Sequence, residues 1–201
     1  FETKDGKDML EKGKDFGARF QSNYNSNDSL GGSLSLYGNV LEDSDFLIYH
    51  NYVSKNNWKD GEGEKTFGVE GDIQNTLFKF GHNINDTQRL SFSYDYLKDE
   101  GDYSPRPDFG KVYNTFATGS ATFPTKYERD TITLKHNLNL GEDLILDTSI
   151  YSNKNELERT ETWTGRTPRP TFSGLLKGNV KTVGLNTKAQ SNIEDGDTLH
   201  T

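Results

Sequence analysis

Strict alternation of apolar and polar residues constrains this chain more than any other feature. Within residues 87–97, Leu90, Phe92, Tyr94 and Tyr96 occupy alternate positions, and polar or charged residues stand between them. Side chains of a β-strand point to opposite faces in turn, so this segment is predicted to be a strand with one apolar and one wet face. The chain contains no run of about 18 apolar residues, which a membrane-spanning helix would need.

The same pattern recurs from Asp15 to the end of the chain. Alternation is clear in 16–24, 30–40 and 131–140, is noisier in 46–55, 74–84, 144–153 and 179–193, and begins again at Thr198. Short polar turns at 41–45, 83–86, 141–143 and 194–197 alternate with longer connections at 55–73, 98–126 and 154–179, and the short 25–29 connection takes a long-connection position. Strands of about ten residues with this asymmetry predict an all-β fold, the antiparallel up-and-down meander of an outer-membrane β-barrel.

Composition narrows the function classes. Hydrophobic residues make up 30% of the 201 residues and aromatic residues 12%, which fits a sheet that is wet on one face. The net charge of -8 disfavours nucleic acid as a partner. The chain has no cysteine, which excludes a disulfide framework, a thiolate zinc site and a cysteine nucleophile.

A soluble antiparallel sandwich or a lipocalin-like barrel is the alternative fold. Charged residues at the centres of the predicted strands suit a wide, water-filled lumen better than the interior of a small barrel. These residues are Arg19, Arg89, Asp95, Lys135 and Asp147. Tyrosines near the predicted strand ends fit an aromatic girdle at the membrane interface, although strand propensity alone also explains them. These tyrosines are Tyr24, Tyr94, Tyr96, Tyr127 and Tyr151.

Residues 1–14 are charged, show no strand period and are predicted to form a linker. Thr3-Lys4-Asp5, followed by Gly13-Lys14-Asp15-Phe16-Gly17, resembles the junction between the plug and the barrel in TonB-dependent outer-membrane receptors. The aspartate–leucine pair of that junction is only approximate here, because Met9 stands between Asp8 and Leu10. The nearest branch contains ferric-enterobactin-type siderophore receptors and haem receptors, and 106–109 resembles a loop stretch of that branch.

The resemblance implies a barrel of about twenty-two strands filled by an N-terminal plug that carries a TonB box. The domain division expected from it is a linker at 1–14 and the first part of a transmembrane barrel at 15–201. About nine strand candidates would supply roughly two-fifths of such a barrel. The implied location is the bacterial outer membrane. The implied partners are its lipid, the ligand and the TonB energy-transducing complex, which would act through the missing plug.

Two of the long connections carry the candidate ligand-binding residues. In 154–179, five basic residues stand against three glutamates, which gives a net charge of +2 inside an acidic chain. Guanidinium groups and aromatic rings suit a flat anionic ligand such as a ferric catecholate. Contacts of the basic residues with lipid phosphates, or simple solvation, are the alternatives. The candidates are Tyr103, Arg106, Arg159, Trp163, Arg166 and Arg169.

The predicted function is therefore uptake of a ferric, enterobactin-like siderophore, without catalysis and without a cofactor. The alternatives are a haem receptor of the same family and a small barrel that acts as an outer-membrane anchor or adhesin. No histidine stands in the longer connections, which weighs against haem. The four histidines lie alone in separate predicted strands, so we expect neither a metal site nor a catalytic constellation. They are His50, His82, His136 and His200.

Overall fold

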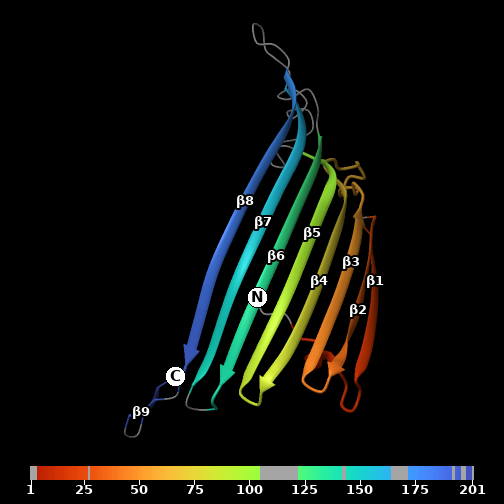
Figure 1. Cartoon of the computed structure of the whole chain (residues 1–201). Helices are drawn as coiled ribbons and strands as arrows, with labels where there is room; N and C mark the ends of the chain where they lie inside the picture. Colours follow the sequence, from red (N-terminus) through yellow and green to blue (C-terminus); the bar gives the residue numbers. More distant parts are fainter. Residues whose placement is uncertain are drawn as a thin grey trace.

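The computed structural model describes residues 4–26, 28–104, 122–141, 144–163, 172–191, 193–195 and 198–200. Its main feature is a sheet of eight antiparallel strands in sequence order (Figure 1). The strands are β1 (Phe16–Asn25), β2 (Ser29–Leu41), β3 (Ser44–Lys55), β4 (Val69–Asn85), β5 (Gln88–Tyr103), β6 (Phe123–Asn139), β7 (Ile145–Trp163) and β8 (Phe172–Gln190). A 3-10 helix, η1 (Lys7–Met9), precedes them.

Each strand pairs only with its neighbours in sequence, and β1 and β8 form the two edges of the sheet. The fold is thus an open up-and-down meander, which confirms the predicted fold class. The ends of β2, β4 and β6 and the starts of β3, β5 and β7 lie at one end of the sheet, here called the short-turn rim, and the opposite strand ends define the long-loop rim (Figure 1). The strand expected from Thr198 does not continue this sheet. Residues 198–200 form β10 (Thr198–His200), which pairs with β9 (Ile193–Asp195) in a separate small sheet.

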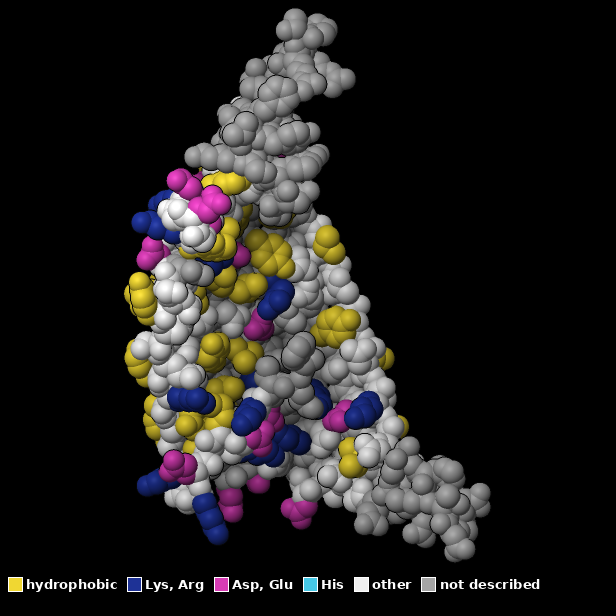
Figure 2. Space-filling model, turned by 180° about the vertical axis from the view of Figure 1, so that it is seen from behind, with side chains coloured by type: hydrophobic (Ala, Val, Ile, Leu, Met, Phe, Trp, Pro, Cys, Tyr) yellow, Lys and Arg dark blue, Asp and Glu magenta, His cyan; other side chains and the backbone are white. Residues whose placement is uncertain are grey.

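The pairing register divides the side chains into two sets. Even-numbered positions of β1–β7 and odd-numbered positions of β8 share one face, the outward face. The other face is the inner face, because the N-terminal segment, residues 4–8, lies against it. Lys79 Nζ donates a hydrogen bond to the Lys4 carbonyl oxygen at 3.0 Å. Figure 2 shows the molecule from behind, where basic and acidic side chains gather in the lower part and at the upper left, with apolar ones between them.

The outward face carries a broad apolar band next to the short-turn rim. Its large side chains are between 37% and 73% exposed, although they would be the core of a soluble protein. Members of the band include Phe20, Leu34, Ile48, Phe80, Phe92, Leu134, Ile150 and Leu185. Only Leu47 and Phe123 are fully buried among the described apolar side chains. The sheet therefore turns its apolar side to its surroundings, as a lipid-facing barrel wall does. No helix in the described ranges is long and apolar enough to cross a membrane.

The strands are longer than predicted. β4–β8 contain 16–19 residues each, and most of the expected connection at 154–179 is strand. Above the apolar band the outward face becomes charged, with ion pairs such as Lys126–Glu128 at 2.8 Å and Lys154–Glu156 at 2.7 Å. Hydrophobic alternation ends where the band ends, but backbone pairing continues. A pattern search for alternating hydrophobicity consequently assigns the upper strands to loops.

The predicted aromatic girdle is only partly correct. Tyr24, Tyr94 and Tyr96 lie on the outward face, whereas Tyr127 and Tyr151 lie on the inner face. A cross-strand glycine explains Tyr151: it stands directly opposite Gly184, where a Cβ would come within 2.4 Å of the tyrosine ring. The ring covers backbone that a glycine leaves bare, which is a recognised way to protect glycines in sheets.

The face assignment predicts unequal effects of two neighbouring lysine substitutions. Phe92→Lys places a charge at the centre of the outward band on β5 and should reduce the folding free energy in lipid bilayers by about 2–4 kcal/mol. Ser93→Lys points to the wet inner face and should cost far less. Urea titration of bilayer-folded protein, followed by tryptophan fluorescence, measures both. Equal destabilisation by the two variants would contradict the assignment.

Candidate ligand-facing inner wall

The inner face carries most of the polar and charged side chains of the strands, as the sequence predicts, together with some apolar ones such as Leu77 and Leu97. All five charges expected on the wet face are on it. Cross-strand contacts link its side chains: Arg129 Nη2 lies 2.8 Å from Asp95 Oδ1, and Asn75 Nδ2 donates to Asp95 Oδ2 at 3.2 Å. On β6 and β7, the Tyr127 hydroxyl donates to Asn155 Oδ1 at 2.6 Å. Such a wall suits a water-filled lumen rather than a packed interior.

One level row crosses this wall near the long-loop rim. Lys55, Gly71, Gly101, Thr125 and Arg159 are successive register partners on β3, β4, β5, β6 and β7. We call it the Lys55–Arg159 row. Neighbouring strands lie roughly 4.8 Å apart, so the two cations stand roughly 19 Å apart at the backbone, with small residues between them. The row thus places one cation at each end of a shallow surface formed by Gly71, Gly101 and Thr125, here called the floor.

Tyr103, a predicted ligand residue, is the last residue of β5 and covers this floor. A Cβ on Gly71 would lie 2.4 Å from its hydroxyl, and one on Gly101 would lie 2.9 Å from its ring. The Tyr103 hydroxyl donates to an Asp99 carboxylate oxygen. Lys55 Nζ stands 5.3 Å from the ring centroid, within the range of a cation–π contact. The tyrosine is thus fixed in place by its own neighbours.

Arg159, another predicted ligand residue, lies on β7 instead of in a loop. Its Nε donates to Thr125 Oγ1 at 3.3 Å, and its Nη1 lies 3.6 Å from Glu161 Oε1. The two charged side chains are 21% and 14% exposed. Glu161 partly neutralises the guanidinium, so Arg159 attracts an anionic ligand less strongly than a solitary arginine would.

The side chains of the other four predicted ligand residues are not described by the structure. Trp163 is the last residue of β7, and its side chain lies outside the described residues, as do Arg106, Arg166 and Arg169 entirely. The structure therefore brings only Tyr103 and Arg159 to one face. Sequence reasoning missed Lys55 and Asp99. The parity of β3 and β5 would have revealed both, because each shares the inner face with the charges that it identified.

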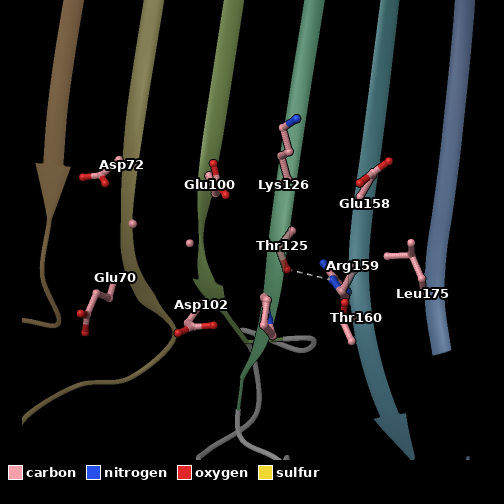
Figure 3. A pocket seen from close by; sticks show the side chains of 13 residues that line it. Glu70, Asp72, Glu100, Asp102, Thr125, Lys126, Glu158, Arg159, Thr160 and Leu175 are labelled. Carbon is pink, nitrogen blue, oxygen red and sulfur yellow. Dashed lines mark hydrogen bonds between the residues drawn. The ribbon is translucent and has the colours of Figure 1, made fainter. Parts of the chain in front are cut away.

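A cavity of about 630 Å³ lies across β4–β8 near the long-loop rim (Figure 3). Its wall carries five carboxylates and two cations, Lys126 and Arg159. The carboxylates belong to Glu70, Asp72, Glu100, Asp102 and Glu158. By strand parity these five belong to the outward face. The cavity lining also includes Gly71, Gly101, Thr125 and Arg159 of the Lys55–Arg159 row. The excess of carboxylates does not suit an anionic ligand.

The three histidines whose side chains the structure describes show no ligand geometry. On the outward face, His50 Nδ1 lies 2.9 Å from Thr76 Oγ1, and His82 Nδ1 lies 2.9 Å from Ser44 Oγ. His136 Nε2 is 3.2 Å from Gln88 Oε1. The described ranges contain no group of three or more histidine, cysteine, aspartate or glutamate side chains that could hold a metal ion.

An open antiparallel meander with an apolar outward band and a charged inner wall is part of a transmembrane β-barrel of an outer membrane. Comparison with known proteins supports this assignment. The heme transporter BhuA of Brucella ovis is 29% identical over 163 residues, which cover 80% of this chain and 23% of the transporter, and that of Brucella abortus matches equally. No protein-family model matches.

Solved structures show the same fold. The FrpB iron transporter of Neisseria meningitidis (F5-1 variant, apoprotein form) superposes with a TM-score of 0.71 and 18% identity over 96% of this chain and 29% of its own. The F3-3 variant gives 0.68 and 20% identity over 95% of this chain and 34% of its own. The chain thus spans about a quarter of the length of the curated relatives and a third of the solved chains.

These matches confirm the resemblance to the barrel part of TonB-dependent receptors and the location in the bacterial outer membrane. The relatives are transporters and not enzymes, which confirms the expectation of a non-enzymatic protein. The division into a linker at 1–14 and a barrel part at 15–201 stays a prediction, although the first strand begins at Phe16.

The surroundings of Tyr103 predict that its ring matters more than its hydroxyl. Tyr103→Phe keeps the cover over Gly71 and Gly101, loses the hydroxyl's hydrogen bonds with Asp99 and Lys55 and should cost about 1–2 kcal/mol of folding free energy. Tyr103→Ala should cost more, because it uncovers the glycine pair. Urea titration in bilayers measures both. Ligand affinity should stay within about twofold in Tyr103→Phe, and a larger loss would mean that the hydroxyl contacts the ligand.

Proposed function

We propose that this chain is part of an outer-membrane receptor that takes up an iron-bearing ligand, and that the ligand is haem. The observation that carries the proposal is the match to the heme transporter BhuA over 80% of the chain. The superposition on iron transporters supports the wider ligand class. This evidence favours the haem alternative over the ferric catecholate that the sequence alone suggested.

The charge pattern of the inner wall supports the same choice. Several described cations on the inner wall have carboxylate neighbours, as in the Arg129–Asp95 and Arg159–Glu161 pairs. A ferric catecholate carries three negative charges and would need an excess of cations around it. Haem is a flat and largely apolar ring with two carboxylates, so a few well-placed cations beside apolar surface are enough. The Lys55–Arg159 row offers two such cations.

Residue roles follow from this placement. Lys55 and Arg159 are proposed to attract the haem carboxylates on the inner wall, below the predicted loop residues. Arg106, Trp163, Arg166 and Arg169 remain proposed contacts on the outer side of the ligand, where arginine and an aromatic ring suit a flat anion. Tyr103 is proposed to shape the floor beneath the ligand.

Energy for uptake is proposed to come from the TonB complex, acting through a plug inside the completed barrel. Eight strands with two open edges would leave backbone groups unpaired in hydrocarbon, at a cost of several kcal/mol each. Transport therefore needs further strands beside β1 and β8. These partners are part of the proposal and not of the described chain.

Growth on a single iron source tests the ligand choice. The full-length receptor is expressed in a strain that lacks its other iron-uptake receptors, and haem or ferric enterobactin is the only iron supplied. We expect growth on haem and none on ferric enterobactin, with an empty vector as control. Growth on ferric enterobactin alone would return the assignment to the catecholate, and growth on neither would refute an iron-uptake role.

Substitution of the predicted loop arginines tests the site. Changing Arg166 and Arg169 together to Ala should weaken haem binding by tenfold to a hundredfold, the equivalent of about 1.5–3 kcal/mol for a lost charge-assisted hydrogen bond. Arg159→Gln should have a smaller effect, because Glu161 already neutralises part of its charge. Lys181→Ala, on the outward face of β8, is the matched control. Equal affinities in the double variant and the control would remove the two arginines from the site.

A further inference from the structure

The N-terminal segment is pressed against the inner wall at the short-turn rim. Gly6 is buried, and a Cβ at this position would lie 2.0 Å from the Phe46 carbonyl oxygen on β3. Backbone therefore lies directly on backbone at this point. No residue of the following helix η1 is buried, so the helix contributes little apolar contact to the docking.

A chain of four alternating charges joins the segment to three strands. Asp5 Oδ1 lies 2.5 Å from Lys79 Nζ on β4, and Asp5 Oδ2 lies 3.0 Å from Arg89 Nη2 on β5. The same Arg89 Nη2 lies 2.6 Å from Asp45 Oδ2 on β3. Asp45 also accepts a hydrogen bond from the Lys7 backbone nitrogen at 3.3 Å through its other carboxylate oxygen.

This cluster is paired and largely shielded from water, and Asp45 is fully buried. The Asp45 side chain is 5% exposed, those of Arg89 and Lys79 are each 12% exposed, and that of Asp5 is 22% exposed. Gly81 provides the space for the guanidinium, because a Cβ at this position would lie 1.9 Å from Arg89 Nη2. Removal of one partner from a buried ion pair strongly destabilises the packed state, because the remaining charge is left without compensation. The docking is therefore sensitive to a single carboxylate.

The docked segment also forms one wall of a cavity of about 750 Å³. Lys4, Asp5 and Asp8 line it on one side, and inner-face residues that include Ser93, Lys135 and Asp147 line it on the other. Movement of the segment would change the width of the interior at the short-turn rim. Docked and released positions would thus correspond to a narrower and a wider passage along the wall.

We propose that residues 4–8 form an electrostatic latch, in which Asp5 bridges Lys79 and Arg89 and holds the segment across the inner wall. The latch closes the interior at the short-turn rim, and it opens when the Asp5 carboxylate loses its charge or its partners. The strands do not depend on it, because the backbone ladder of β3–β5 is complete without the segment. This proposal does not rest on the identity of the ligand.

A distance measurement between two spin labels tests the latch. The chain has no native cysteine. Lys7→Cys and Asp86→Cys carry the labels, one on the segment and one in the β4–β5 turn, and any cysteine elsewhere in the full-length protein is replaced by serine. We expect one narrow distance distribution for the full-length protein in outer-membrane vesicles. Adding Asp5→Asn should raise the ratio of released to docked segment about tenfold to a hundredfold and broaden the distribution.

Two further variants make the result decisive. Glu11→Gln removes a negative charge from the same segment outside the latch and should leave the distribution narrow. Gly6→Val keeps every charge but forces the backbones apart, and it should also release the segment. A narrow distribution in Asp5→Asn, or a broad one in Glu11→Gln, would overturn the latch. Heat-modifiable migration on gels checks that each variant retains its folded sheet.

Acidification supplies a second test of the same contact. Burial opposes ionisation of Asp5, but Lys79 and Arg89 outweigh it and hold the pKa of Asp5 below its ordinary value. Other charges around it are Asp45 on β3 and Asp8 on the segment itself. A depressed carboxylate pKa stabilises the docked state above the ordinary value of about 3.9, and this stabilisation is lost as the pH falls through the lowered pKa.

The docked fraction should therefore stay constant from neutral pH to about pH 5 and fall as the pH drops below about 4. The spin-label pair measures it directly. Asp5→Asn should remove this dependence, because no carboxylate remains at the position to titrate. A docked fraction that does not change at low pH, or one that falls equally in the variant, would show that Asp5 does not hold the segment.

Discussion

Backbone pairing in a medium without water is the constraint on which this structure depends. In hydrocarbon, each unpaired N–H or C=O group costs several kcal/mol, so a chain that crosses with strands must pair them continuously. β2–β7 are each paired on both sides, in ladders that run almost the full length of the strands. The ladder fixes the register, and a slip of one residue would exchange the apolar and polar faces.

The inner wall follows from that register. Alternate positions that cannot face lipid must carry groups that water or neighbours satisfy, and here they pair across strands, as Lys135 and Asp147 do at 3.3 Å. Glycines on this face leave spaces that larger inner side chains fill. Tyr151 covers Gly184, Tyr103 covers Gly101, and Arg89 occupies the space beside Gly81. The pairing of a glycine with a large partner is thus a repeated local solution.

Sequence alone could predict the faces but not the strand lengths. The strict alternation in residues 87–97 identifies their apolar face, because the side chains on that face must contact lipid. The upper parts of β6 and β7 gave no such signal, since Lys126, Glu128 and Lys154 stand outside the band and only backbone pairing keeps them in strands. Tyr127 was misassigned to the girdle for a related reason: tyrosine suits both an interface and a polar wall, and only parity decides between them.

The candidate site was harder to predict than the fold, and the physical reason is compensation. A net charge of +2 in 154–179 suggested a basic loop, but pairing partners such as Glu158 for Lys177 and Glu161 for Arg159 lie on the same or the adjacent strand. Net charge along a segment does not report which groups neutralise one another across strands. Similarity to a heme transporter therefore outweighs the charge argument for a catecholate.

The two ends of the inner wall differ in how their charges are held. Towards the long-loop rim, Arg129 and Asp95 are 38% and 27% exposed, and water screens an ion pair of this kind. At the short-turn rim, Asp45 and Arg89 are 5% and 12% exposed, and water screens them far less. A change of one charge should therefore have a smaller effect towards the outer end than where the N-terminal segment docks. The fold thus leaves its outer charges adaptable to a ligand and concentrates its electrostatic sensitivity at the opposite end of the interior.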